Sequence, residues 1–145
     1  MRTIESWLSE YSESHQHPVN IAIHKIAVPL VMLSVLGLAG SVSLIFPFLL
    51  VVGAIAFYFR LSTSLAIGML VLSAIELRVV YWMDGHLGIP LWLVSLLIFA
   101  FAWILQFIGH AVEGKRPSFM KDLWFLLIGP AWVITPIYRL IKVRL

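Results

Sequence analysis

The residues best suited to chemistry are histidines that gather in two parts of the chain. Three of the five histidines, His15, His17 and His24, fall within ten residues of one another, and His110 lies far along the chain. The chain has no cysteine, which excludes thiolate ligands and cysteine nucleophiles. Imidazole nitrogens bind both iron and zinc. The histidines therefore indicate a candidate site for a transition metal.

The first part combines a helix break with two polar residues on one helical face. Pro18 cannot continue a helix but suits the first position of a new one, so we expect the chain to break near residues 15–17. Asn20 and His24 are four residues apart and share a face of the new helix. Because of the break, His15 can fold back towards that face. The alternative is a surface loop whose histidines lie among lipid headgroups.

The second part places an imidazole and a carboxylate at the end of an apolar stretch. His110 and Glu113 are three residues apart, so both side chains can point in one direction. Gly109 leaves room for another backbone to approach closely. In the alternative interpretation, Glu113 pairs with a neighbouring cation at the surface, and Gln106 forms a hydrogen bond between helices.

Several metal chemistries fit these residues. Fe(II) oxygenases use a few imidazole and carboxylate ligands, which leaves open positions for substrate and O2. Zinc accepts the same ligands. A haem with His24 and His110 as its axial pair is a third possibility. Membrane di-iron hydroxylases resemble one another in carrying more histidines, in clustered boxes, than the five of this chain.

Composition indicates that these residues are held by membrane helices. The chain has 145 residues, of which 61% are hydrophobic and 12% charged, whereas soluble domains have about 25% charged residues. Its length fits one domain, residues 1–145. The net charge of +3 comes from cations between and beyond the apolar segments, where anionic lipid headgroups explain them. We therefore expect contact with a lipid bilayer and no nucleic acid partner.

The hydrophobic pattern predicts an all-α membrane bundle with four transmembrane helices. Each apolar segment is about long enough for the roughly 30 Å hydrocarbon core. The four segments are residues 21–38, 44–59, 61–80 and 90–108, with a tight hairpin expected at Arg60 between the second and third.

Two further segments are expected to lie at or dip into the membrane. Residues 3–13 form an amphipathic pattern that predicts a short interfacial helix. Residues 123–141 are apolar but interrupted by Pro130 and Pro136, which predicts a broken re-entrant or interfacial hairpin rather than a straight span.

The distribution of positive charge sets the expected topology. With four spans, the cations fall on one side of the membrane, which the positive-inside rule makes cytoplasmic. His15, His24 and His110 then share the cytoplasmic side, and His86 lies on the other. A bacterial inner membrane is favoured over the endoplasmic reticulum.

Taken together, the two histidine motifs resemble the signatures of the Mpo1-like family over essentially the whole chain. The first is H-x-x-P-x-N-x-x-x-H followed by a proline, here His15, Pro18, Asn20, His24 and Pro29. The second is W-x-x-Q-F-x-G-H with a nearby Glu and Pro, here Trp103, Gln106, Phe107, Gly109, His110, Glu113 and Pro117.

The resemblance implies a membrane-embedded, Fe(II)-dependent dioxygenase that uses O2 to shorten 2-hydroxy fatty acids by one carbon. It further implies His15, His24 and His110 as iron ligands, with Asn20 and Glu113 as supporting or additional ligands. In the fungal pattern the Glu follows its His by four residues, whereas here it follows by three. His17 and His86 match no motif position.

Other readings remain open beside this one. Lys25, Gln106 and Arg116, together with Lys115, are candidates for binding the substrate's polar head because of their placement near the histidines. A zinc-dependent membrane lipid hydrolase would use the same histidines. A non-catalytic haem- or metal-binding membrane protein is the third interpretation.

Overall fold

The computed structural model describes residues 2–144, and the regular structure of these residues is entirely helical, as predicted. The elements are α1 (Ile4–Glu13), α2 (Pro18–Val42), α3 (Ile45–Leu61), α4 (Thr63–His86), α5 (Leu91–Glu113), a short 3-10 turn η1 (Ser118–Met120) and α6 (Phe125–Leu140). The predicted break between residues 13 and 18 is confirmed, and α2 begins with Pro18 in its first turn.

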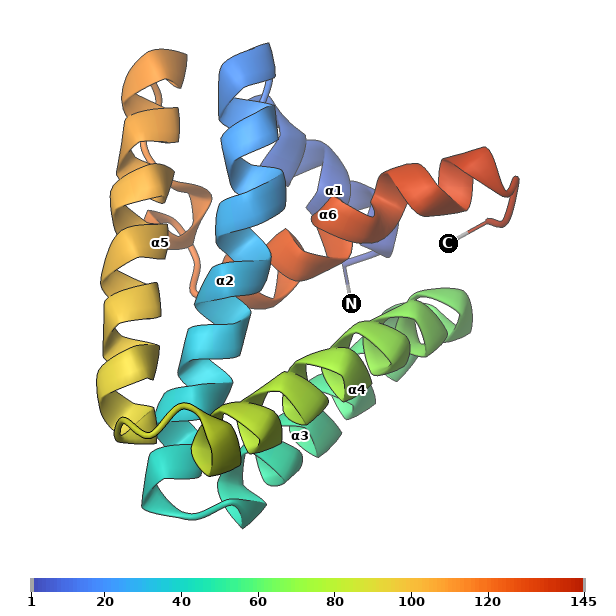
Figure 1. The fold of residues 1–145 in the computed structure, drawn as a ribbon. Helices are drawn as coiled ribbons and strands as arrows, with labels where there is room; N and C mark the ends of the chain where they lie inside the picture. Colours follow the sequence, from blue (N-terminus) through green and yellow to red (C-terminus); the bar gives the residue numbers. More distant parts are fainter. Residues whose placement is uncertain (1, 145) are drawn as a thin grey trace.

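The helices α2 and α5 lie side by side and antiparallel, and form the upright pair around which the other elements are arranged (Figure 1). Each helix has a row of fully buried residues without bulky side chains, spaced seven apart, which is about two turns. The rows are Asn20, Ala27 and Ser34 on α2, and Ser95, Ala102 and Gly109 on α5. Such rows let two helix backbones approach closely within a membrane.

Two glycines show how close this approach is. A Cβ atom added at Gly109 of α5 would lie 2.4 Å from Oδ1 of Asn20 on α2. A Cβ atom added at Gly37 of α2 would lie 2.1 Å from Oγ and 3.1 Å from Cβ of Ser95 on α5. These contacts lie towards opposite ends of the pair, so α2 and α5 stay close together along most of their length.

A second pair, α3 and α4, forms the predicted tight hairpin. Ser62 is the single residue between the two helices, and its hydroxyl accepts a hydrogen bond from the Leu65 backbone at the start of α4. The hairpin packs against the lower part of α2 and extends obliquely away from the upright pair (Figure 1).

Of the four predicted spans, the one at α3 is short for a membrane span. Three helices are long and apolar enough to cross a membrane: α2, α4 and α5. With 17 residues, α3 is about 25 Å long, which is short of the roughly 30 Å hydrocarbon core.

The two end segments pack against each other. Ile4, Trp7 and Tyr11 form the buried face of α1, as its amphipathic pattern predicted, and α1 lies along α6. The ring of Trp7 contacts the ring of Phe125 edge-on, with centroids 5.1 Å apart.

The hairpin expected at residues 123–141 is not formed, because α6 is one helix that continues through Pro130 and Pro136. Each proline removes a single backbone donor, and neighbouring structure can offset that loss in a membrane protein. Here Ile128, Ala131 and Ile134 are buried along the helix, so tertiary packing stabilises α6 across both prolines.

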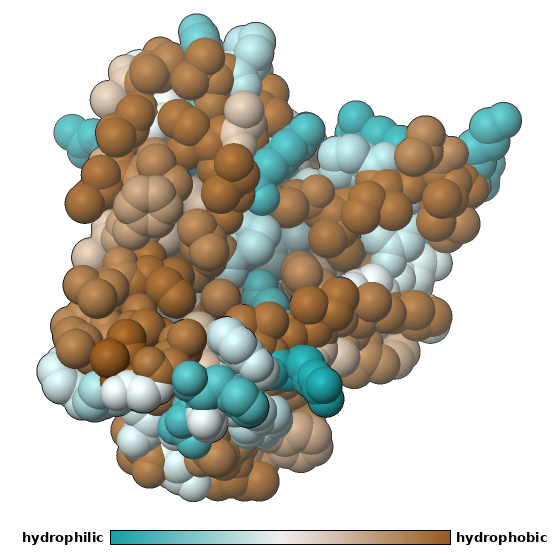
Figure 2. Space-filling model, viewed as in Figure 1, coloured by the Kyte–Doolittle hydropathy of each residue, from teal (hydrophilic) through white to brown (hydrophobic). Residues whose placement is uncertain are grey.

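The outer surface of the molecule is apolar. Figure 2 shows hydrophobic side chains over most of the visible face, with hydrophilic ones gathered at the ends and in a hollow between the elements. On α5, Leu97, Phe101 and Ile104 are each more than half exposed. A surface of this kind fits lipid rather than water, which agrees with the predicted membrane association.

The close approach of α2 and α5 predicts that a side chain at Gly37 destabilises the fold. We expect Gly37→Leu to lower the unfolding free energy by about 1–3 kcal/mol through overpacking, measured as thermal unfolding in detergent. Gly53→Leu is the matched control, because a Cβ atom at exposed Gly53 of α3 meets nothing within 4 Å. Equal melting temperatures of the two variants would contradict the packing argument.

Candidate metal centre

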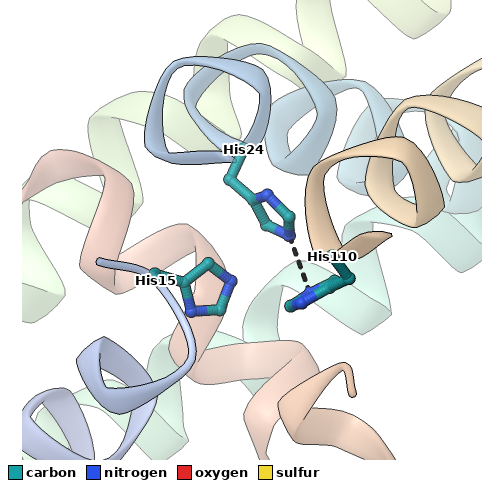
Figure 3. A group of neighbouring side chains, drawn as sticks. All are labelled: His15, His24 and His110. Atoms are coloured by element: carbon teal, nitrogen blue, oxygen red, sulfur yellow. Dashed lines mark hydrogen bonds between the residues drawn. The ribbon is translucent and has the colours of Figure 1, made fainter. Parts of the chain in front are cut away.

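Three imidazoles from separate segments converge at one end of the upright pair. His24 comes from α2, His110 from the last turns of α5, and His15 from the link between α1 and α2 (Figure 3). All three are buried, with exposed fractions of 3%, 1% and 6% for His15, His24 and His110. One ring nitrogen from each lies within 4.8 Å of the other two. The structure thus brings together the three residues that the sequence singled out as metal ligands.

The spacing of the nitrogens suits a metal ion. The Nε2 atoms of His24 and His110 lie 3.1 Å apart. Two nitrogens bound to one ion at about 2.1 Å lie about 3.0–3.4 Å apart for octahedral or tetrahedral angles. Nε2 of His15 is buried and has no hydrogen-bond partner among residues 2–144. A buried nitrogen without a partner costs free energy, and a metal ion would satisfy it.

The remote ring nitrogens of two histidines are fixed by backbone carbonyls. Nδ1 of His15 lies 2.7 Å from the Tyr11 carbonyl oxygen, and Nδ1 of His24 lies 3.1 Å from that of Asn20. When Nδ1 carries the proton and donates it there, Nε2 keeps its lone pair for a metal, which is the usual support for a ligating histidine. The tautomers that fit these contacts are therefore the ones that bind metal.

Burial also favours the neutral form of His15. Removal from solvent lowers the pKa of its imidazole to about 4, although the hydrogen bond with the Tyr11 carbonyl acts in the opposite direction. A histidine must be neutral to bind a metal. His15 therefore needs no deprotonation step at neutral pH.

Glu113 and Asn20 hold the link that carries His15. The Glu113 carboxylate accepts hydrogen bonds from the backbone N–H groups of Gln16 and His17 at 2.8–3.1 Å, and from Nδ2 of Asn20 at 3.0 Å. Nδ2 of Asn20 also donates to the Ser14 carbonyl at 3.1 Å. The carboxylate thus faces the link and the start of α2, and the three-histidine group is formed without it.

Two residues near the site have roles that the sequence analysis did not anticipate. His17, which matched no motif position, caps α2, since its Nδ1 accepts a hydrogen bond from the Val19 backbone at 3.2 Å. The signal was present, because a polar residue directly before a proline at the first helical position is typical of an N-cap. Lys115 donates to the Glu13 carbonyl at the end of α1, so it fastens α1 to the segment after α5.

An apolar cavity of about 400 Å³ begins beside the histidines. Tyr11, Gln106, His110 and Ser118 line its end near the metal centre, and aliphatic and aromatic side chains of α2, α3, α5 and α6 line the rest. Along α5 the lining runs from Phe99 to His110, which is about 16 Å of helix.

Of the residues predicted to bind a polar substrate head, one lines this cavity and two do not. Gln106 lines it, whereas Lys25 and Arg116 are exposed and lie outside the lining. Their role in binding a substrate stays a prediction.

Comparisons with known proteins agree on a family. The chain matches the family model described as 2-hydroxy-palmitic acid dioxygenase Mpo1-like over residues 1–141. It is 29% identical over 143 residues to the protein named 2-hydroxy-palmitic acid dioxygenase MPO1 from Saccharomyces cerevisiae, with 90% of this chain and 77% of that protein covered. No solved structure matches the chain.

The fold and the site together define a class of protein: a helical protein with a three-histidine centre beside an apolar cavity. Because the family model covers nearly the whole sequence, the chain belongs to the Mpo1-like family.

The contacts of Glu113 predict that it acts on the metal indirectly, by holding His15 in place. We expect Glu113→Ala to weaken metal affinity by about 10–100-fold, the usual effect of losing a supporting partner, as measured by competition with a chromogenic chelator. Glu5→Ala, in the exposed first turn of α1, is the matched control. Unchanged affinity in Glu113→Ala would show that the link keeps its position without the carboxylate.

Proposed function

We propose that this protein is an Fe(II)-dependent dioxygenase that cleaves 2-hydroxy fatty acids by α-oxidation. One 2-hydroxy acid and one O2 give the acid that is one carbon shorter, one CO2 and one water, so atoms and electrons balance without an external reductant. The observation that carries the proposal is the buried three-histidine centre at one end of an apolar cavity. The name of the yeast relative supports the same substrate class.

The ligand set fits an iron centre with open positions. His15, His24 and His110 would hold the ion through neutral nitrogens, and positions not filled by protein remain for substrate and O2. Bound iron would supply the activation of O2 that no side chain can provide. The chain's own residues hold the ligands, keep them neutral and exclude water, since all three imidazoles are buried.

The same geometry bears on the other candidate functions. Axial histidines of a haem lie on opposite faces of the ring, with their nitrogens about 4 Å apart when each bond is about 2 Å. The 3.1 Å between the Nε2 atoms of His24 and His110 leaves no room for that arrangement. Zinc fits the three nitrogens as well as iron does, so a zinc-dependent lipid hydrolase is separated from the dioxygenase by its metal and by O2 uptake.

The cavity and its surroundings suggest how the substrate binds. The alkyl chain would lie among Val28, Met32, Val35 and the other apolar lining residues, where its burial is favourable. Lys25 and Arg116 would attract the carboxylate from the membrane surface, and Gln106 would contact the polar head inside. We further propose that this end lies on the cytoplasmic side, to which the positive-inside rule assigns the cations, and that the membrane is a bacterial inner membrane.

Replacement of one histidine of the centre should abolish both metal binding and oxygen uptake. Protein loaded anaerobically with Fe(II) and given 2-hydroxyhexadecanoic acid should consume O2 and release the fifteen-carbon acid, whereas His110→Ala should fall to the background of metal-free protein. His86→Ala is the matched control, because His86 is exposed, stacks on Trp82 and lies at the far end of α4. Oxygen uptake that survives in His110→Ala would contradict the proposal.

The metal itself provides a second arm of this experiment. Zn(II)-loaded protein should bind the acid and consume no O2. If iron binds without oxygen uptake, while the zinc form hydrolyses a lipid amide or ester, the hydrolase interpretation replaces the dioxygenase.

The position of the cavity predicts a substitution that shortens the accepted chain. Ala54 of α3 lines the cavity, so Ala54→Phe should fill part of it and lower kcat/KM for the sixteen-carbon substrate by about tenfold. A ten-carbon 2-hydroxy acid should be affected less. The neighbouring Val52 is half exposed and lies outside the lining, so Val52→Phe is the matched control. An equal effect on both chain lengths would exclude this cavity as the acyl site.

A further inference from the structure

The cavity contains few polar groups with which to receive the head of an anionic substrate. None of its lining residues is Lys, Arg, Asp or Glu, among the residues that the structure describes. A carboxylate in an apolar cavity is costly unless hydrogen bonds replace its water. Beyond the metal itself, recognition of that carboxylate therefore depends on neutral donors in the wall.

The hydroxyl groups of the cavity wall differ in whether they already form a hydrogen bond within the protein. The Tyr58 hydroxyl donates to the Leu127 carbonyl at 2.6 Å, and Oγ of Ser118 pairs with Oγ of Ser14 at 2.6 Å. The Tyr11 hydroxyl forms no hydrogen bond with any residue in the described range 2–144. It is the hydroxyl of the wall that is left to bind a ligand.

The Tyr11 ring is held firmly beside the metal centre. It stacks on the ring of His15, with centroids 4.1 Å apart and planes 7° from parallel. Phe125 and Trp132 contact it from α6, and the side chain is 6% exposed. A side chain held in this way donates a hydrogen bond with little further loss of conformational entropy.

The backbone of α6 approaches the Tyr11 hydroxyl closely at Gly129. A Cβ atom at Gly129 would lie 3.1 Å from that hydroxyl oxygen, so the glycine keeps a side chain away from it. A phenol has an ordinary pKa of about 10, so the Tyr11 hydroxyl carries its proton at neutral pH. A protonated phenol is a donor, as binding of an anion requires.

We propose that Tyr11 is a substrate-binding residue whose hydroxyl donates a hydrogen bond to the carboxylate of the bound 2-hydroxy acid. The inference rests on the proposed function for the identity of the ligand. Tyr11 then has two roles, because its backbone carbonyl orients His15 while its hydroxyl contacts the substrate. The first role belongs to the main chain and survives a change of side chain.

The test is binding of the acid to Tyr11→Phe, which keeps the stacked ring and loses only the hydroxyl. Fe(II)-loaded protein in lipid nanodiscs is titrated anaerobically with 2-hydroxyhexadecanoic acid and, separately, with its methyl ester. Tyr81→Phe is the matched control, because the Tyr81 hydroxyl donates to the Leu44 carbonyl at the exposed surface, away from the cavity. Iron content and melting temperature are measured for each variant.

We expect Tyr11→Phe to bind the acid about tenfold more weakly than wild type, since hydrogen bonds to charged groups are the stronger ones. The ester, a neutral acceptor, should lose at most about threefold, with iron content and melting temperature unchanged. The inference is overturned if Tyr11→Phe binds the acid with wild-type affinity, or if it loses affinity for the acid and the ester equally. It is also overturned if the wild-type protein fails to bind the acid. A wild type that binds the acid but consumes no O2 refutes the dioxygenase, while the binding ratio still decides the role of Tyr11.

Discussion

The close approach of α2 and α5 at Gly109 is the contact on which the three-histidine site depends. His24 and His110 come from different helices, and their nitrogens reach 3.1 Å only because the backbones are close there. A Cβ atom at position 109 would meet Oδ1 of Asn20 at 2.4 Å and Nδ1 of His24 at 3.2 Å. The glycine beside His110 therefore allows the short distance between the two imidazoles, although it binds nothing itself. A larger residue at this position would separate them.

His15, the third histidine of the site, is positioned in another way, because it lies outside both helices. A link of a few residues is held in place by Glu113 from α5, by Asn20 from α2 and by the Tyr11 carbonyl from α1. These contacts join three elements at the point where the ligands meet. A carboxylate used in this way accepts hydrogen bonds from several donors at once.

Apolar side chains form both the exterior of the molecule and the wall of the cavity. The exterior of α5 is apolar, as expected of a helix that faces lipid, and the cavity wall between the helices is apolar as well. Tyr11, Gln106 and Ser118 give the lining beside His110 a polar character. The end helices α1 and α6 close this region from one side, and α1 contributes both the Tyr11 side chain and the start of the link.

Local patterns in the sequence were enough to predict the helical class, the break before Pro18, the hairpin near Arg60 and the three histidines of the site. These follow from local rules, since proline geometry, hydrophobic runs and imidazole chemistry are properties of short segments. Tertiary structure alone decided that α6 continues through Pro130 and Pro136, that α3 and α4 run obliquely, and that Glu113 turns to the link. It also placed Tyr11, which the helical pattern assigned to an amphipathic face, beside the metal centre. The reason is that these features depend on which surfaces meet, and residues more than ninety positions apart, such as Asn20 and Glu113, have no local pattern that records their contact.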